Sequence, residues 1–253
     1  MAKPILVANW KNHPSSPEEA KKLLKELSKK RKLFKKTTLF IAPPFTYFES
    51  VSERITGFGR LAAQNISSLP PGNYTGQVTP DILKNFGVRL CILGHSERRG
   101  FGETSEHIAK KVKAALRSGI APLVCIGEKE RDAEGEHFEF LREQLKSSLA
   151  GLNAKAAAKT AIAYEPVWAI GKSAKDAINL TELSQTVIFI KKVLADLFGR
   201  KTAEAIAILY GGSVEPDNAN ELMRNSGIRG FLVGHASLDA KSFNAIAESL
   251  SKT

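Results

Sequence analysis

Short apolar runs alternate with segments of helical periodicity along this chain of 253 residues. Several runs are almost continuously apolar, as expected for parallel strands that are buried on both faces. Interpreted as strands, they number eight and cover Ile5–Ala8, Thr38–Ala42, Leu61–Ala63, Leu90–Leu93, Ala121–Cys125, Thr160–Tyr164, Ala205–Leu209 and Gly230–Val233. The alternation of strands and helices predicts an α/β protein with a parallel sheet and right-handed crossovers.

Two of the segments between these runs illustrate the helix signal. Ser16-Pro17-Glu18-Glu19 has the spacing of a capping box, with proline at the first helical position. The apolar stripe that follows consists of Ala20, Leu23, Leu24 and Leu27. Thr104 can cap a second helix, whose stripe consists of Ile108, Val112, Ala115 and Leu116.

The number of strand–helix units favours closure of the sheet into a (β/α)8 barrel. About 250 residues is a typical length for such a barrel, so we expect one domain over residues 1–253. The main alternative is an open, doubly wound sheet. No G-x-G-x-x-G motif follows the first predicted strand, and this absence argues against the alternative.

Reactive side chains follow several of the predicted strands, and in a barrel all strand carboxyl ends meet at one rim. Lys11 follows the first strand, His95 the fourth and Glu165 the sixth. Glycine-bearing turns, Gly211-Gly212-Ser213 and Gly234-His235, follow the last two, where barrels often hold phosphate.

Each of these features has an ordinary explanation on its own: a solvated lysine, a histidine that caps a helix, a surface glutamate or a tight turn. Together on one rim they indicate an active site. Glu165 would be its base, and the loop Pro166–Gly171 that follows resembles a lid.

Charge and composition narrow the function classes. The formal net charge is +11, and many of the cations lie in the first predicted helix and just beyond it. A solvated helix face explains them, and a phosphorylated metabolite would also be attracted. Nucleic-acid binding is not expected, because no aromatic–basic interleaving or recognised binding motif is present.

Other sequence features bear on location and covalent chemistry. No apolar stretch approaches the roughly 20 residues that span a bilayer. No signal peptide is recognised either, so we expect a cytoplasmic protein without membrane contact. Cys91 and Cys125 lie within apolar runs and are expected to be buried and inert, forming neither a disulfide framework nor a zinc site.

The motifs quoted so far, with several others, resemble the triosephosphate isomerase family. The resemblance runs in order over essentially the whole chain and is most specific at Tyr164–Gly171 and Gly94–Arg99. Its other motifs are Asn9-Trp10-Lys11, Ala63-Gln64-Asn65, Tyr74-Thr75-Gly76, Cys125-Ile126-Gly127-Glu128, Tyr210-Gly211-Gly212-Ser213-Val214 and Phe231-Leu232-Val233-Gly234. It implies a TIM barrel.

The resemblance also implies an activity, for which this family is itself a well-studied example. Dihydroxyacetone phosphate and D-glyceraldehyde 3-phosphate would be interconverted through an enediolate, in glycolysis and gluconeogenesis. Glu165 would be the base, neutral His95 the electrophile, and Lys11 would offset the substrate's charge. Asn9 would position its oxygens, and Glu97 would lie near Lys11. Backbone N–H groups for the phosphate would come from Gly171, Ser213, Gly234 and His235. No metal or organic cofactor is implied.

A homodimer is also implied, formed through the loop Asn65–Thr79 that carries Thr75. The chain departs from the family at four places. Lys172–Lys175 replaces the usual second half of the lid, Asn12-His13 follows the lysine, and Gln77 replaces a glutamate that pairs across the dimer with Arg98. His235 replaces a second glycine, and its imidazole would either turn outward or add a side chain at the phosphate.

Two other functions remain open from the sequence. A different phosphate-binding barrel enzyme, acting on a larger sugar phosphate, would need a cavity much larger than a triose. A catalytically silent barrel kept for binding would be favoured by loss of Lys11, His95 or Glu165, but all three are present.

Overall fold

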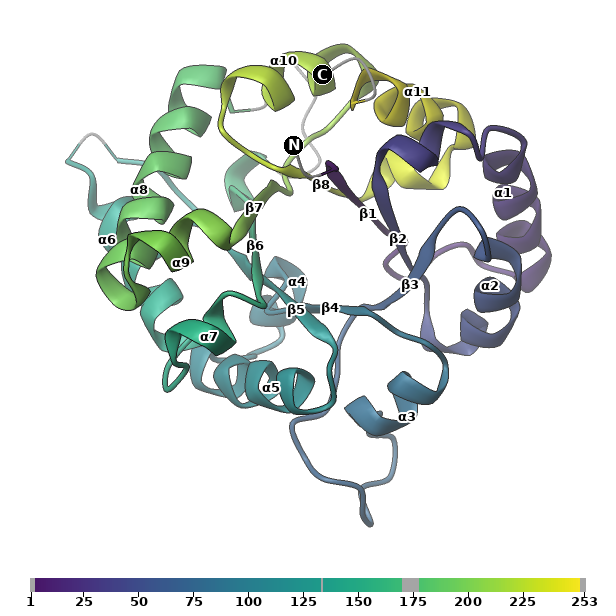
Figure 1. Ribbon diagram of the computed structural model, residues 1–253, viewed down its shortest axis with the longest axis horizontal. Coiled ribbons are helices and arrows are strands. Elements are labelled where there is room, and N and C mark those ends of the chain that lie inside the picture. Colours follow the sequence, from purple (N-terminus) through teal and green to yellow (C-terminus); the bar gives the residue numbers. More distant parts are fainter. Residues whose placement is uncertain (1–2, 133, 170–177, 251–253) are drawn as a thin grey trace.

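Eight parallel strands form a closed barrel in the computed structural model, which describes residues 3–132, 134–169 and 178–250 (Figure 1). Each strand pairs with its neighbours in sequence order, and the first pairs with the last. The strands are β1 (Ile5–Asn9), β2 (Thr38–Ala42), β3 (Arg60–Ala63), β4 (Leu90–Leu93), β5 (Ala121–Ile126), β6 (Ala161–Tyr164), β7 (Ala207–Tyr210) and β8 (Gly230–Val233). The predicted barrel is confirmed, and the open sheet is excluded.

The predicted boundaries of the seventh strand were wrong. Ala205 ends a helix, and the strand begins at Ala207 and extends to Tyr210. Ile206 N still donates to Thr202 O at 3.1 Å, so the helical hydrogen bonding continues into the apolar run. A short apolar run does not by itself distinguish the end of a buried helix from the start of a buried strand.

The barrel closes between β1 and β8, where Ile5 pairs with Gly230. A Cβ atom added to Gly230 would lie 1.8 Å from the carbonyl oxygen of Ile5. Only glycine therefore allows this close approach of the two backbones.

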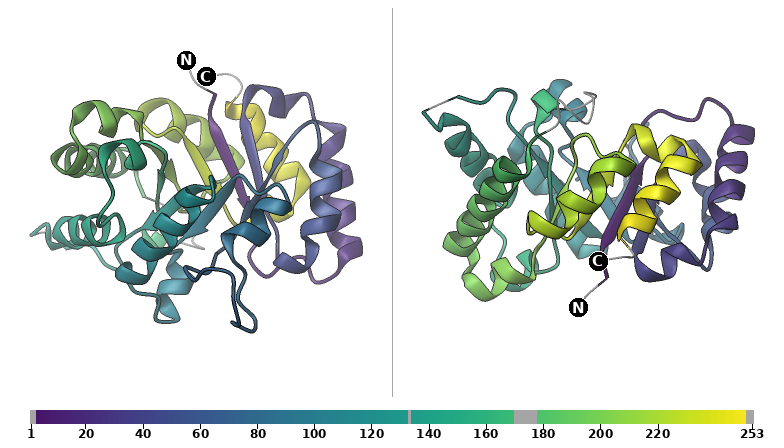
Figure 2. Two further views of the ribbon diagram at one scale, coloured as in Figure 1. Left: turned by 60° about the horizontal axis from the view of Figure 1, so that its bottom comes forward. Right: turned by 90° about the horizontal axis from the view of Figure 1, so that it is seen from above.

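Helices surround the barrel as an outer ring (Figures 1 and 2). No helix among the described residues is long and apolar enough to cross a membrane. The α-helices are α1 (Pro17–Lys29), α2 (Phe48–Ile55), α3 (Pro80–Asn85), α4 (Ser96–Gly100), α5 (Ser105–Arg117), α6 (Glu136–Ser148), α7 (Ala154–Ala157), α8 (Leu180–Phe198), α9 (Arg200–Ala205), α10 (Pro216–Asn225) and α11 (Ala240–Leu250). The 3-10 helices are η1 (Leu33–Lys36), η2 (Phe45–Tyr47), η3 (Val167–Ala169) and η4 (His235–Leu238).

The predicted helix caps are present, with one difference. Ser16 Oγ accepts from Glu19 N at 3.2 Å, and Thr104 Oγ1 accepts from His107 N at 3.3 Å. The Glu19 carboxylate, however, accepts from Ser15 N at 3.1 Å instead of returning to Ser16. The capping box is therefore only half formed, because the carboxylate binds the neighbouring N–H group.

Two apolar layers stabilise the fold. One fills the barrel interior, and the other lies between the strands and the helices. Cys91 and Cys125 are both fully buried and free, as expected, and burial raises the pKa of each thiol. A thiol held in its neutral form is a poor nucleophile, so these cysteines serve packing.

Candidate active site

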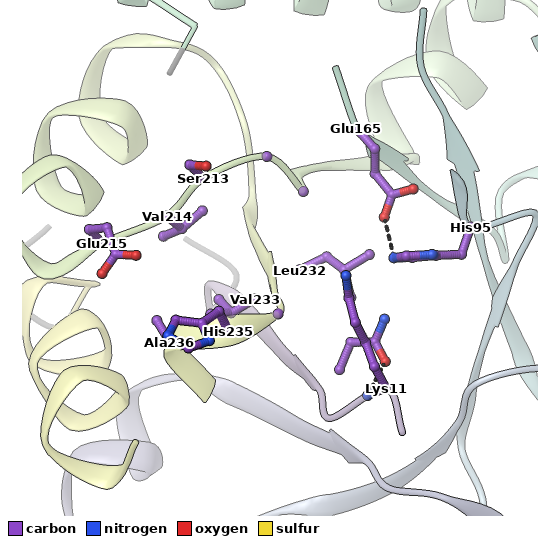
Figure 3. Close-up of a pocket in the computed structure, with 14 residues that line it drawn as sticks. Lys11, His95, Glu165, Ser213, Val214, Glu215, Leu232, Val233, His235 and Ala236 are labelled. Carbon is purple, nitrogen blue, oxygen red and sulfur yellow. Dashed lines mark hydrogen bonds and ion pairs between the residues drawn. The ribbon is translucent and has the colours of Figure 1, made fainter. Parts of the chain in front are cut away.

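One hollow at the carboxyl ends of the strands brings together residues from β1, β4, β6, β7 and β8 (Figure 3). Its volume is about 180 Å³. It is lined by Asn9, Lys11, His95, Glu165, Gly211, Gly212, Ser213, Val214, Glu215, Leu232, Val233, Gly234, His235 and Ala236. Of the predicted site residues that the structure describes, all but Glu97 line this hollow. The small volume argues against a substrate much larger than a triose.

Lys11 has an unusual backbone conformation, with φ at +52°. This left-handed conformation costs roughly 1–2 kcal/mol for a residue with a side chain. Its neighbours hold it in place: Lys11 N donates to Asn9 Oδ1 at 3.1 Å, and Gln64 Nε2 donates to Lys11 O at 2.7 Å and to Ala42 O at 2.8 Å. Gln64 therefore positions Lys11, a role that the sequence analysis did not assign.

Glu97 lies outside the lining of the hollow but pairs with Lys11. Lys11 Nζ is 2.6 Å from Glu97 Oε1, and both side chains are partly exposed. An exposed pair of this kind contributes little to stability. Its consequence is geometric, because it holds the ammonium group in one orientation at the edge of the hollow.

His95 is buried, and its hydrogen bonds indicate which ring nitrogen carries the proton. The imidazole lies at the N-cap of α4, where Nδ1 accepts from Glu97 N at 3.3 Å. A nitrogen that accepts a hydrogen bond carries no proton, so this contact is the one that a neutral ring with its hydrogen on Nε2 would make. Nε2 lies 3.3 Å from Glu165 Oε1 (Figure 3).

Glu165 is 2% exposed and follows the last residue of β6. Its Oε2 accepts from Ser96 N at 3.1 Å, and its backbone N donates to Ile126 O at 2.8 Å. Added Cβ atoms would lie 1.8 Å from Glu165 O at Gly127 and 2.8 Å from Glu165 Cγ at Gly211. Gly127, which follows β5, therefore makes room for the backbone of Glu165, and Gly211, which follows β7, makes room for its side chain. Sequence reasoning gave neither of them this role.

The turns after β7 and β8 form the other end of the hollow. Ser213 is buried, and its Oγ donates to Ala169 O at 2.9 Å. A Cβ atom on Gly234 would lie 3.5 Å from Lys11 Cε, so this turn adjoins the lysine. His235 is exposed and lies away from His95 and Glu165 (Figure 3). Across the described ranges, no three His, Cys, Asp or Glu side chains are grouped as metal ligands would be.

Comparison with known proteins decides the family. A family model described as triosephosphate isomerase matches residues 4–250. The chain belongs to the triosephosphate isomerase family. It is 44% identical over 253 residues to the triosephosphate isomerase of Geobacter metallireducens, an alignment covering 97% of this chain and 98% of that protein. It is also 43% identical over 251 residues to that of Citrifermentans bemidjiense, again covering 97% and 98% of the two chains.

Membership of the triosephosphate isomerase family confirms the predicted barrel and the predicted enzyme class. The protein is an isomerase of triose phosphates, an activity of glycolysis. Not every expected site residue can be compared with the geometry, because Gly171 and the unusual segment Lys172–Lys175 lie outside the described residues. The same holds for the end of the expected lid.

The start of the expected lid is anchored by Glu128, a buried residue to which the sequence analysis assigned no role. Glu128 Oε1 accepts from Tyr164 Oη at 2.8 Å, from Trp168 Nε1 at 2.9 Å and from Arg131 Nε at 3.1 Å. Val167 N donates to Glu128 O at 2.9 Å. Burial and the Glu128 carboxylate together raise the pKa of the Tyr164 phenol, which stays a donor. The described part of the lid thus begins from a fixed point.

Proposed function

We propose specific roles for the residues by which this isomerase interconverts dihydroxyacetone phosphate and D-glyceraldehyde 3-phosphate. Glu165 is the base that removes a proton from one carbon and returns it to the neighbouring carbon. One observation carries the proposal: a buried carboxylate lies 3.3 Å from Nε2 of a buried imidazole, in a hollow of about 180 Å³. A carboxylate suits this work because it can accept a proton and then release it.

His95 is the electrophile. Its Nδ1 is occupied by the N–H of Glu97, so Nε2–H is available to donate toward the substrate oxygens. A donor already oriented at the place where negative charge develops stabilises an enediolate without reorganising. The shared contact with Glu165 supports the role, because base and electrophile then face the same two carbon atoms.

Lys11 and Asn9 complete the polar wall. The ammonium group of Lys11 offsets the negative charge of the substrate, and the side chain of Asn9 orients the substrate oxygens. Glu97 acts through Lys11 by fixing its ammonium group, which it contacts at 2.6 Å. The left-handed backbone of Lys11 supports this assignment, since strained conformations concentrate at functional sites.

The phosphate group binds at the turns after β7 and β8. Backbone N–H groups of Ser213, Gly234 and His235 are its ligands, together with Gly171, which lies outside the described residues. The proximity of Gly234 to Lys11 supports this arrangement, because the dianion would then lie beside a cation. Closure of Pro166–Gly171 would exclude water from the enediolate phosphate, which otherwise eliminates phosphate.

We propose that the protein is a homodimer. The segment between β3 and α3 projects from the barrel and carries Thr75 (Figures 1 and 2). Tyr74 and Phe101, which line one hollow with Thr75, are 43% and 88% exposed, and such exposed aromatic groups are typical of an interface. Arg98 already pairs within the chain, since its Nε donates to Glu103 Oε1 at 3.4 Å. The uncharged Gln77 therefore leaves no unpaired arginine.

Two further expectations from the sequence remain proposals. We propose that residues 1–253 form one domain and that the protein works in the cytoplasm. The continuous ring of strands supports the first, and two buried free thiols are consistent with the second. Limited proteolysis tests the first, because a single domain gives no pair of stable fragments. Fractionation of cells tests the second.

The experiment for the reaction is turnover of D-glyceraldehyde 3-phosphate by the purified chain. The matched variant Glu165→Gln keeps the shape of the side chain and removes its basicity. Fast turnover that this variant abolishes supports Glu165 as the base. Fast turnover in both proteins would overturn the assignment. A measurement of mass in solution on the same sample tests the homodimer.

A further inference from the structure

A second hollow opens at the other end of the barrel, where the strands begin. Its volume is about 650 Å³, and its walls come from Lys3, from residues 34–35 and 37–39, and from residues 57–60. These segments precede or begin β1, β2 and β3, which pair side by side (Figure 1). In a parallel barrel the amino ends of the strands lie opposite the rim that carries Glu165, so this hollow is separate from the active site.

Three cationic side chains line this amino-end hollow: Lys3, Lys35 and Arg60, all of them exposed. No carboxylate is among the described residues that line it. Across the described ranges, none of the three cations has a side-chain hydrogen bond or an ion pair. The three like charges therefore surround one space, and no opposite charge lines it within the part of the chain that the structure describes.

Some cations on the nearby helices are paired within their own helix. Lys29 Nζ lies 2.6 Å from Glu26 Oε1, and Arg54 Nη1 lies 3.5 Å from Glu53 Oε2. Attraction to the C-terminal end of a helix also explains a cation such as Lys29. It does not explain Lys3 or Arg60, because one precedes a strand and the other begins one. The amino-end hollow is thus a different arrangement from a solvated helix face.

The walls of the hollow are fixed by backbone and ring contacts. Thr38 N donates to Pro4 O at 2.7 Å, and Gly59 N donates to Ile55 O at 2.9 Å. The ring of Phe58 packs on that of Phe34 with their centroids 5.9 Å apart. A site whose walls are already ordered loses little conformational entropy when a ligand binds.

We propose that the amino-end hollow binds an anion with two or more adjacent phosphate groups. Such a chain of phosphates occurs both in free inorganic oligophosphate and in nucleoside triphosphates. Cations from three separate segments can each meet a different phosphate group, and the hollow is larger than the 180 Å³ of the active site. The positive net charge of +11 would raise the local concentration of anions. The proposal is independent of the roles assigned to the active-site residues.

Calorimetric titration with tripolyphosphate tests the proposal, with the active site occupied by glycerol 3-phosphate, which has no carbonyl group to react. We expect one binding event per chain that weakens as sodium chloride rises, because salt screens exposed charges. AMP, with a single phosphate, should bind at least roughly tenfold more weakly. Equal affinity for ATP and tripolyphosphate would identify the phosphate chain as the ligand. Tighter binding of ATP would identify a nucleotide that also contacts the wall at Phe58.

Two double variants distinguish a specific anion-binding site from general attraction of anions to the charged surface. Lys35→Gln with Arg60→Gln should weaken tripolyphosphate binding by roughly tenfold, since each lost charge pair is a modest term. Lys22→Gln with Lys110→Gln removes the same charge from exposed helix faces and should leave binding unchanged. Lys3→Gln provides a second, single variant if the first double variant folds poorly. Turnover of triose phosphate should be the same in all of them.

Three results would overturn the proposal. The first is no detectable binding of tripolyphosphate by the unmodified protein. The second is an equal loss of affinity in both double variants, which would indicate attraction to the whole charged surface. The third is tighter binding of a single-stranded oligonucleotide that does not depend on Lys35 and Arg60, which would indicate a nucleic-acid surface instead.

Discussion

Replacing Gln64 by glutamate tests the way in which the strained backbone of Lys11 is held. The two side chains have the same shape, but the substitution replaces the amide NH2 by an oxygen. Nε2 of Gln64 donates to Lys11 O at 2.7 Å and to Ala42 O at 2.8 Å, so both carbonyl oxygens would then face another oxygen. Each lost hydrogen bond costs about 1 kcal/mol. Ala42 O keeps the bond that it accepts from Trp10 N at 3.1 Å, so among the described residues only Lys11 O is left without a donor, which costs about 1 kcal/mol more.

The expected loss of unfolding free energy is therefore about 3 kcal/mol. For a chain of this length, that loss lowers the midpoint of thermal unfolding by roughly 6–12 °C. Differential scanning calorimetry measures it. The matched control is Gln144→Glu, because at that position the oxygen makes the bond, accepting from Gly127 N at 2.8 Å. The control variant keeps this acceptor, so it should lose less unfolding free energy than Gln64→Glu.

The penalty in Gln64→Glu should also depend on pH. A carboxylate that faces two carbonyl oxygens is favoured in its protonated form, so its pKa in the folded state rises above the ordinary value of about 4.3. Protonation restores one of the two donors. The deficit is therefore smallest below about pH 4.3 and grows as pH rises through the folded-state pKa. A midpoint that is unchanged at neutral pH, or equal losses in the two variants, would refute the reasoning.

Three other substitutions probe the active site. Glu165→Asp draws the carboxylate back by about 1 Å and should slow turnover by roughly 100-fold. The affinity for a small phosphorylated inhibitor should barely change. Unchanged turnover would rule out Glu165 as the base. In His235→Gly the affinity for that inhibitor, measured by competitive inhibition, should stay within about twofold of that of the unmodified protein. The reason is that the backbone N–H, and not the imidazole, is the proposed ligand. A larger change would assign a role to the imidazole. Gly127→Ala should destabilise the fold by at least about 2 kcal/mol in a denaturant titration, because the added carbon meets a backbone oxygen. In Gly211→Ala the added carbon meets only the flexible side chain of Glu165. This variant should therefore lose more turnover than stability.

The barrel was largely predictable from the chain because parallel strands buried on both faces leave continuous apolar runs. The exception at Ala205–Leu209 arose where a helix and a strand share one apolar run, so composition carried no boundary. The predicted capping box at Ser16 was confirmed for one of its two hydrogen bonds, the one that Ser16 Oγ accepts from Glu19 N. The second half failed because Ser15 offers the Glu19 carboxylate both an N–H and a hydroxyl, at 3.1 and 3.0 Å.

The rim residues were predictable for a different reason. Each one follows a strand directly, so the topology alone brings Lys11, His95 and Glu165 to one end of the barrel. The supporting residues were not predictable in this way. Gln64 and Gly127 act across a gap between strands, through distances of a few ångströms that no spacing in the sequence encodes.

The pairing of Ile5 with Gly230 has a consequence for how the chain is made. During synthesis β1 leaves the ribosome long before β8, because Gly230 follows Ile5 by 225 residues (230 minus 5). Until β8 has been made, β1 can pair on one side only. Its other edge then has unpaired N–H and C=O groups to which a strand of another chain can bind. Contacts so distant in sequence also form slowly, since a long loop must close first. The period before closure is therefore when this barrel is most exposed to aggregation and most dependent on chaperones.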